Sequence, residues 1–525
     1  MQDGRTPREW SPAGVCILIA AISVAVPLIA VVCLALKLSA VTAGIVALAT
    51  ALITIPFAGR LVPTKLIQGR RTKILLMMWL ILSLGASYRI GTMSVFMLDA
   101  SKTDYAFVPR LREFSDPQLA KPFFPKHNCF TSYVIGAYLA DQGDENIYAS
   151  DHYRDAEVET PIHETIGELL TVDRYQYPPP FLLLPYAMLS SGMDFFQMRT
   201  VWFAINVALL FLTVAALATW IGGRGFNAYW FAWPLAVLAP VTLATLQMGN
   251  AHMFIILISL LAMLAFEKNW NFVGGTLLGY AIVSKLFPGV LLAYLVMRRR
   301  WRPTGWTVGM MGVLGCATLA ALGAAPFKAF FDYQVPRLAS GEAFGFMTTY
   351  IRAIVVNLSV MGIPYRLVEL GVLADDNAPR IATALVWIHT VLIVAAIAVL
   401  GNRHRRDPFT APVPETVMLR RRQLACGWTL LLILGELRSP FLPWGYANVP
   451  ILILCYLLLP ACTRVWTRAC LLGGVLMFSV AVPLAYGPTT GTLDLCYALG
   501  ATLIALALCI GVIWRQKPDQ ELTTA

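Results

Sequence analysis

One lysine, Lys285, stands inside an otherwise apolar segment and is the residue best suited to chemistry in this sequence. Val283, Leu286 and Phe287 surround it. An ammonium at membrane depth costs a few kcal/mol on insertion scales, and a phosphate or carboxylate partner offsets that cost. We therefore expect Lys285 to hold an anionic group. The alternative is a lysine whose long stem carries its charge to the membrane interface.

Other polar residues also interrupt apolar runs. Glu436 and Arg438 are two residues apart in such a run, so they do not share one helical face. Each is expected to pair elsewhere, in a structural ion pair or with a substrate. Gln247, Asn250 and His252 fall between two apolar runs. Their polar groups suit sugar hydroxyls, and a polar helix cap explains them nearly as well.

The composition predicts a membrane protein with many spans. Hydrophobic residues make up 58% of the 525 positions and charged residues 13%, and the mean hydropathy is +0.67. A soluble globular chain does not hide so much apolar surface. A span needs about 20 apolar residues, so we expect an all-α polytopic bundle of about 12 transmembrane helices. Examples of such runs are 15–36, 42–57, 74–96, 201–220 and 495–514.

The net charge of +11 comes largely from basic clusters between apolar runs. Such clusters are typical of cytoplasmic loops, so the charge indicates membrane orientation and not nucleic-acid binding. The residues expected to be cytoplasmic are Arg5, Arg8, Arg60, Lys65, Arg70, Arg71, Lys73, Arg298, Arg299, Arg300, Arg302, Arg403, Arg405, Arg406, Arg420, Arg421 and Arg422.

Ten cysteines give no sign of a disulfide framework or a metal site. Nine of them lie in or beside apolar runs, and only Cys129 lies in a long polar loop. Neither a zinc-type spacing nor a secreted-type cysteine pattern is present. We expect no metal and no cofactor.

A long polar segment at 97–177 follows the first spans. An odd number of crossings from a cytoplasmic start places it outside, and its many aromatic residues favour an ordered cap of helices on the membrane surface. The predicted organisation is N-terminal helices at 1–96, this extracytoplasmic loop at 97–177, a core with broken helices at 178–300, C-terminal helices at 301–515 and a cytoplasmic tail at 516–525.

Within the core, Pro, Gly and polar residues shorten the apolar runs. Helix breaks at membrane depth persist only where protein or a water-filled cavity satisfies the freed backbone. We expect the 271–297 segment to form two half-helices that meet near Lys285, Phe287 and Pro288. The polar stretch 326–350 should lie outside, like the 97–177 loop.

Several short motifs follow one another between positions 99 and 459. Their order resembles that of glycosyltransferase family 87, polyprenyl-phosphate-sugar-dependent transferases of the GT-C superfamily. The motifs are Asn146-Ile147-Tyr148, Tyr177-Pro178-Pro179, Gln247-Met248-Gly249-Asn250, Gly275 to Gly279, Lys285-Leu286-Phe287-Pro288 with the arginines after it, Asn357-Leu358-Ser359-Val360-Met361-Gly362, and Ser439-Pro440 with Trp444.

The resemblance implies a GT-C-like bundle with a cavity open to the outer face. In such an inverting reaction an aspartate of the first outer loop acts as general base, and Lys285 is well placed for the donor phosphate. Here the expected aspartate aligns with Cys129, and Tyr446 stands near the position of a family histidine. The base is then Asp104, ranked first, Asp99 or His127, or the activity has been lost.

These observations favour an inner-membrane glycosyltransferase whose site faces the non-cytoplasmic side. It would use a polyprenyl-phosphate hexose or pentose and a lipid or cell-envelope glycan acceptor, among membrane lipids and without nucleic acid. The alternatives are a transporter or flippase of a lipid-linked saccharide, which should show two related halves, and an inactive scaffold. The residues expected to bind substrate are Lys285, Tyr177, Gln247, Asn250, Asn357 and Tyr446.

The orientation can be tested by labelling single added cysteines in intact cells. A membrane-impermeant maleimide should react with a cysteine at position 146 and not with one at position 300, because Asn146 lies in the acidic loop and Arg300 in an arginine cluster. The parent chain gives the background, and permeabilised cells show that both positions can react. Reaction at 300 alone would reverse the orientation.

Overall fold

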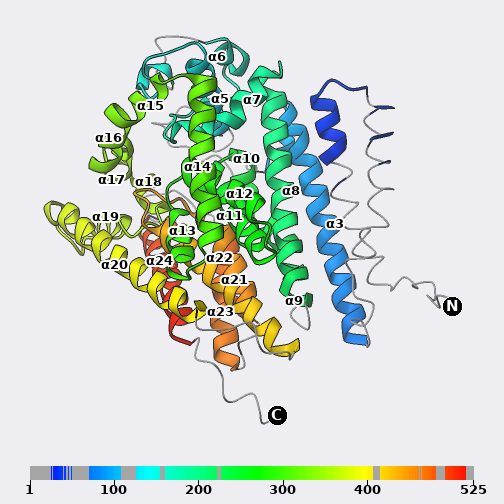
Figure 1. The fold of residues 1–525 in the computed structure, drawn as a ribbon, viewed down its shortest axis with the longest axis vertical. Coiled ribbons are helices and arrows are strands. Elements are labelled where there is room, and N and C mark those ends of the chain that lie inside the picture. Colours follow the sequence, from blue (N-terminus) through cyan, green and yellow to red (C-terminus); the bar gives the residue numbers. More distant parts are fainter. Residues whose placement is uncertain are drawn as a thin grey trace.

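The chain folds into a bundle of helices with a cap of shorter elements at one end (Figure 1). The computed structural model describes residues 70–107, 126–153, 160–221, 226–405, 414–459, 464–480 and 491–515, together with residue 462 and part of 25–49. Several expectations lie outside these residues: most of the 15–36 and 42–57 spans, the 516–525 tail, and Arg5, Arg8, Arg60, Lys65 and Arg406.

The described residues are almost entirely helical, as the sequence predicts. The first part contains α3 (Arg70–Leu98), η2 (Thr103–Tyr105), β1 (His127–Asn128), α5 (Phe130–Asp141), η4 (Ser150–His152), α6 (Pro161–Ile166) and β2 (Thr171–Val172). The middle contains η5 (Pro179–Leu182), α7 (Leu183–Ser190), α8 (Phe195–Ile221), α9 (Phe226–Leu238), α10 (Pro240–Met248), α11 (Ala251–Glu267), α12 (Asn271–Ser284) and α13 (Gly289–Met297).

The remaining part begins with the long helix α14 (Trp301–Leu322) and a series of short helices. These are α15 (Ala325–Ala329), η7 (Phe330–Gln334), α16 (Val335–Ser340), η8 (Glu342–Phe344), α17 (Phe346–Thr349), α18 (Ile351–Val356), α19 (Gly362–Glu369) and η9 (Asp375–Asn377). Longer helices follow: α20 (Ala378–Arg405), α21 (Pro414–Leu437), α22 (Trp444–Leu458), α23 (Val465–Val480) and α24 (Gly491–Arg515).

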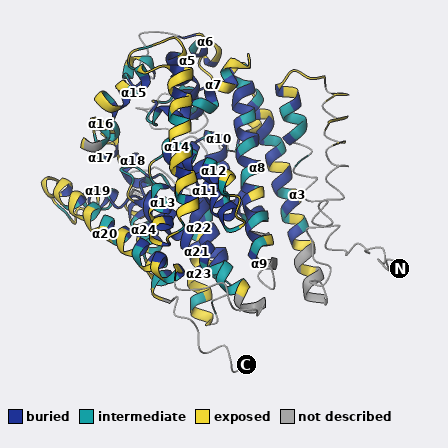
Figure 2. Cartoon of the chain, in the orientation of Figure 1, coloured by how far each residue is buried: buried dark blue, intermediate teal, exposed yellow. Residues whose placement is uncertain are grey.

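Five helical segments among the described residues are long and apolar enough to cross a membrane, or six if the bent pair α10 and α11 counts as one span. Their outer faces are apolar as well: in α20, Trp387 is 64% exposed and Val391 67%. Figure 2 shows such exposed residues along α14 and α20 around an interior of buried helices. Contact with lipid explains these apolar faces, because exposing them to water would be unfavourable. The count of about 12 spans stays a prediction.

Two helix breaks lie at the centre of the bundle. Helices α10 and α11 meet at 105°, where Gly249 takes a left-handed backbone with φ of 68° and Asn250 caps α11 through its side chain. Helix α12 ends before Lys285, whose backbone is extended, and α13 begins after Pro288. The predicted pair of half-helices is therefore confirmed.

The described residues of the 97–177 loop contain helices, as predicted, but the longest of these helices does not lie on the surface. Nearly every residue of α5 is buried, because α5 packs against α7 and the rest of the bundle. Figure 1 places α5 and α6 at the same end of the bundle as α15, which starts the 326–350 stretch. The two segments expected outside thus share one end, while their sidedness stays a prediction.

Helices α12 and α14 pack closely because glycines of α12 face the backbone of α14. A Cβ at Gly275 would lie 2.8 Å from the carbonyl carbon of Trp306. We expect Gly275→Ala to destabilise the protein by about 1–3 kcal/mol, the usual cost of overpacking. The midpoint of thermal unfolding in mild detergent measures this.

The matched control for Gly275→Ala is Gly309→Ala in α14, where an added Cβ meets nothing within 4 Å. Alanine favours a helix over glycine by about 1 kcal/mol, so this variant should be unchanged or slightly more stable. Equal stability of the two variants would contradict the close packing of α12 against α14.

Candidate active site

A chain of three charged or polar side chains connects the two helix breaks to α21. The Nζ atom of Lys285 lies 2.8 Å from Nδ1 of His252, and Nε2 of His252 lies 2.7 Å from Oε2 of Glu436. Glu436 is fully buried and His252 is 1% exposed. The carboxylate is therefore the buried counter-charge of the lysine, reached through the imidazole.

The direction of the hydrogen bonds follows from the lysine. An ammonium can only donate, so Nδ1 of His252 accepts and the ring proton sits on Nε2, from which it is donated to Glu436. Among the described residues His252 is the one hydrogen-bond partner of the Lys285 ammonium. Two of its three N–H donors are thus left for another acceptor.

Aromatic rings hold this chain in place. The Lys285 ammonium lies 5.1 Å from the centre of the Tyr177 ring, within the range of a cation–π contact. Phe287 stacks on one side of His252 at 4.9 Å and Tyr446 is stacked at 5.8 Å. The rings restrict the positions of both the ammonium and the imidazole.

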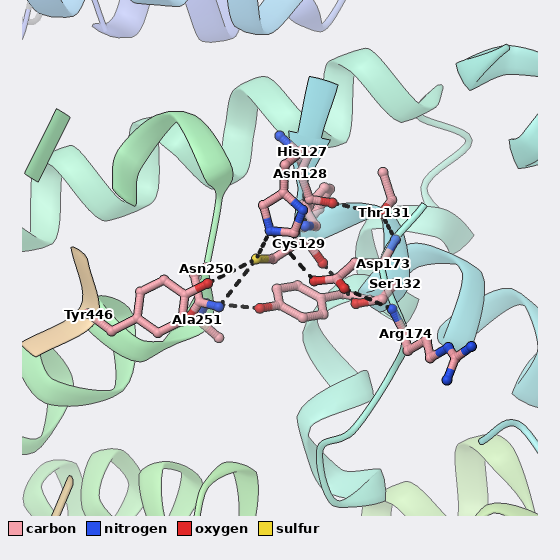
Figure 3. Close-up of polar contacts among 12 residues, drawn as sticks. His127, Asn128, Cys129, Thr131, Ser132, Asp173, Arg174, Asn250, Ala251 and Tyr446 are labelled. Carbon is pink, nitrogen blue, oxygen red and sulfur yellow. Dashed lines mark hydrogen bonds and ion pairs between the residues drawn. The ribbon is translucent and has the colours of Figure 1, made fainter. Parts of the chain in front are cut away.

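Cys129 lies beside this chain and joins it to the 97–177 loop. Its Sγ atom is 3.4 Å from the hydroxyl of Tyr446, 3.3 Å from Nδ2 of Asn250 and 3.5 Å from Nε2 of His127. Figure 3 shows the sulfur between these groups. Burial raises the pKa of the Cys129 thiol to about 12, so the sulfur is a protonated thiol at neutral pH.

Backbone hydrogen bonds from the end of α10 position Cys129. Its N–H donates to the carbonyl of Met248 at 2.8 Å, and Nδ2 of Asn128 donates to the carbonyl of Gln247 at 3.1 Å. Both acceptors belong to the last turn of α10, where the helix leaves carbonyls without an intrahelical partner. Because α10 ends at Gly249, its last carbonyls are available to bind the 128–129 segment of the loop.

Asp173 is brought to the same place by a short parallel strand pair. Asn128 of β1 pairs with Val172 of β2, and the N–H of Asp173 donates to the Thr131 hydroxyl at 3.0 Å. Oδ2 of Asp173 lies 3.9 Å from Nε2 of His127. The Asp173 side chain is 38% exposed and the His127 side chain 12%, so solvent reaches the carboxylate. Figure 3 shows Asp173 beside His127 and Cys129.

One donor atom from each of His127, Cys129 and Asp173 lies within 4.8 Å of the other two, and one metal ion can reach three atoms so placed. The distances fit a metal incompletely. Zinc bonds of about 2.0–2.2 Å to nitrogen and oxygen give a tetrahedral edge of about 3.4 Å, shorter than the 3.9 Å between His127 and Asp173.

The structure brings most of the expected site residues together. His127, Tyr177, Asn250, Lys285 and Tyr446 all belong to the network described above. The amide oxygen of Asn250 caps α11 and its nitrogen contacts Cys129, while its contact with a sugar stays a prediction.

The side chains of Gln247 and Asn357 form hydrogen bonds with backbone groups. Oε1 of Gln247 accepts from the N–H of Phe107 at 2.7 Å. The amide of Asn357 bonds the carbonyl of Pro440 and the N–H of Leu442, which joins the start of the 357–362 motif to the segment after α21. Their substrate contacts stay predictions.

The two aspartates expected at the loop start lie apart from the network. Asp99 accepts hydrogen bonds from the side chain and N–H of Ser101, which lower its pKa. Asp104 is exposed in η2. Among the described residues no hydrogen bond or ion pair joins either one to Cys129 or Lys285.

Sequence reasoning missed Asp173. The residue stands four positions before Tyr177, in a polar stretch without a marked pattern, and the two-residue strand just before it has no periodicity to detect. The pairing of His252 with Glu436, 184 residues apart, was equally hidden, although both residues stood out individually.

Comparisons with known proteins give one match. The model of glycosyltransferase family 87 matches residues 175–431, a range that includes Tyr177, Asn250 and Lys285 and leaves out Cys129 and Asp173. Neither the curated proteins nor the solved structures contain a match to the chain.

Removing the buried carboxylate should destabilise the protein. Glu436→Ala leaves the Lys285 ammonium without its counter-charge, and loss of one partner of a buried pair costs about 3–5 kcal/mol. Thermal unfolding in mild detergent measures the loss. Arg438→Ala is the matched control, because Arg438 is exposed and its Nε bonds only the Thr390 hydroxyl. An equal effect of both substitutions would contradict a stabilising role of Glu436.

Proposed function

We propose that this chain, whose residues 175–431 match the model of glycosyltransferase family 87, transfers a hexose or pentose from a polyprenyl-phosphate donor to a lipid or cell-envelope glycan. The family gives the general activity, sugar transfer by a membrane protein. The donor and acceptor classes are our proposal, and the single observation that carries them is the arrangement around Lys285.

Lys285 has the properties of a phosphate ligand. Its ammonium keeps two N–H donors beyond the bond to His252, and the Glu436 carboxylate stabilises its charge through the imidazole. A compact ammonium binds phosphate as a point charge. In a low-dielectric site such a charge stabilises a leaving phosphate more strongly than it would in water.

The proposed reaction is a single displacement at the anomeric carbon. The oxygen of an acceptor hydroxyl forms a bond to this carbon while the bond from the carbon to the phosphate oxygen breaks. The electron pair of the broken bond stays on the phosphate beside Lys285, and the hydroxyl proton passes to a base. Attack from the face opposite the phosphate inverts the configuration.

Tyr177 contacts Lys285, Asn250 contacts Cys129, and Tyr446 contacts both Cys129 and His252. Tyr177 and Tyr446 are partly exposed, and their rings flank the ammonium and the imidazole. We assign the sugar of the donor to these groups, because rings and amides suit the apolar faces and the hydroxyls of a sugar.

The same proposal covers the setting of the enzyme. It would be a GT-C-like bundle of about 12 spans in the inner (plasma) membrane, with the site on the non-cytoplasmic side and with no cofactor beyond the lipid-linked donor. The helix breaks at Gly249 and Lys285 support this arrangement, since broken helices line the binding sites of many membrane proteins.

Substitution of Lys285 tests the function. In membranes that contain the overproduced chain, label from polyprenyl-phosphate hexoses and pentoses should pass into lipid or glycan. Lys285→Ala should lower this transfer at least about 10²-fold, because removing one transition-state charge contact costs about 2.7–4 kcal/mol. Lys285→Arg should keep part of it, since the charge is retained.

Lys268→Ala is the control for Lys285→Ala. Lys268 follows α11, is exposed and contacts only the Trp270 ring by its charge, so transfer should be unchanged. Normal transfer by Lys285→Ala at matched protein levels would refute the phosphate assignment. Movement of the intact donor between the two leaflets of vesicles, without any transfer of sugar by the parent chain, would favour a flippase.

A further inference from the structure

We propose that Asp173 is the catalytic base, and that the acceptor hydroxyl binds beside His127 and Cys129. This inference rests on the proposed glycosyl transfer and adds the residue that takes the proton. It concerns the end of the network farthest from Lys285, counted through Cys129, Tyr446 and His252.

The other carboxylates considered as bases either bond another side chain or lie apart from the network. Glu436 is fully buried and bonds His252, so it serves as the counter-charge of Lys285. Asp99 is held by Ser101, and Asp104 is exposed without a contact to the network. Asp173 is the described carboxylate whose oxygen lies within 4.8 Å of both His127 and Cys129.

The backbone of Asp173 is fixed while one carboxylate oxygen stays available. Strand β2 and the Thr131 hydroxyl hold its main chain. Oδ1 accepts from the N–H of Arg174 at 3.0 Å, whereas Oδ2 faces Nε2 of His127 at 3.9 Å. That separation is too long for a hydrogen bond. The Cys129 thiol also contacts the Asp173 carboxylate, and the lone pairs that remain can accept a hydrogen bond from an incoming hydroxyl.

Exposure separates this end of the site from the lysine end. The Asp173 side chain is 38% exposed, while His252 and Glu436 are almost completely buried. A hydroxyl acceptor can therefore approach the exposed Asp173 side chain while the donor phosphate meets Lys285 beside the buried His252 and Glu436. Inversion by in-line attack needs the base and the leaving group on opposite sides of the anomeric carbon, and we assign these two places to Asp173 and Lys285.

Cys129 does not compete for the proton. Its thiol is held protonated by burial, with a pKa of about 12, and it contacts Tyr446 and Asn250. We assign the thiol a packing role between the two ends of the site. His127 is a positioning residue, because its Nε2 atom lies 3.5 Å from the sulfur and 3.9 Å from the Asp173 carboxylate.

The proton balance is complete without a further reactant. Oδ2 of Asp173 takes the proton of the acceptor hydroxyl as its oxygen bonds to the anomeric carbon, and the neutral carboxylic acid later returns the proton to solvent through its exposed side. The phosphate leaves as an anion beside Lys285. Sugar transfer changes no oxidation state, so no oxidant or reductant takes part.

The first experiment compares transfer rates in membranes at matched protein levels, again with polyprenyl-phosphate hexoses and pentoses as probes. Asp173→Asn keeps the shape and removes the basic oxygen, so the maximal rate should fall about 10²-fold or more. The concentration of donor that gives half-maximal rate should change little, because Lys285 is untouched. Glu164→Gln, an exposed carboxylate of α6 in the same loop, is the control and should be unchanged.

The second experiment removes the carboxylate at position 173 and introduces one at position 129. An aspartate at position 129 would put its oxygens near the place of Sγ, within reach of the same acceptor. In the double variant Cys129→Asp with Asp173→Asn, transfer should recover at least about 10-fold over Asp173→Asn alone. A residue that only stabilised the loop would not be replaced in this way.

The outcomes separate the two proposals. If the parent chain transfers sugar and Asp173→Asn does so at a near-normal rate, the base assignment is wrong and the proposed function stands. Loss in Asp104→Asn or Asp99→Asn with Asp173→Asn active moves the role to that residue. If EDTA abolishes transfer and Zn²⁺ restores it, a metal held by His127, Cys129 and Asp173 replaces the free base. Absence of transfer by the parent chain refutes the function itself.

Discussion

The Lys285 ammonium lies in apolar surroundings that disfavour a charge, and the fold around it supplies the groups that stabilise this charge. The ammonium is connected through His252 to Glu436, which lies on a distant part of the chain. For the three groups to meet, α12 has to stop before the lysine, α11 has to start at the histidine, and the end of α21 has to pass beside both. Buried charges are stable only when such partners are complete. The helix breaks are therefore required by electrostatics as much as by chain geometry.

The site that results has a dry end and a partly hydrated end. At the dry end, fixed charge is strong because water does not screen it. At the other end, Asp173 directly follows a short strand in a polar loop, where a proton can be exchanged with solvent. Cys129 separates the two ends and contacts groups from both. A small, protonated side chain suits this position, because a second charge there would interact with the lysine and the aspartate at once.

The sequence predicted those features that stand out within their own segment of the chain. A charge in an apolar run is conspicuous, so Lys285 and Glu436 could be selected, and Pro288 with its neighbours predicted the break between α12 and α13. The partners could not be predicted, because nothing in the sequence relates His252 to a glutamate 184 positions away. Asp173 was missed for a similar reason: a two-residue parallel pair has neither length nor periodicity. Asn357 had the right chemistry for a ligand, but its amide is used by backbone groups.

The attachment of the 128–129 segment to α10 is made by main-chain carbonyls. Carbonyls of Gln247 and Met248 accept from Asn128 and from the N–H of Cys129, and the N–H of residue 129 is present whatever its side chain. Mutation can therefore exchange the side chain at this position without detaching the loop or shifting its register. Such a backbone anchor lets a family of enzymes change the identity of a reactive group over evolutionary time while the scaffold that presents it stays the same.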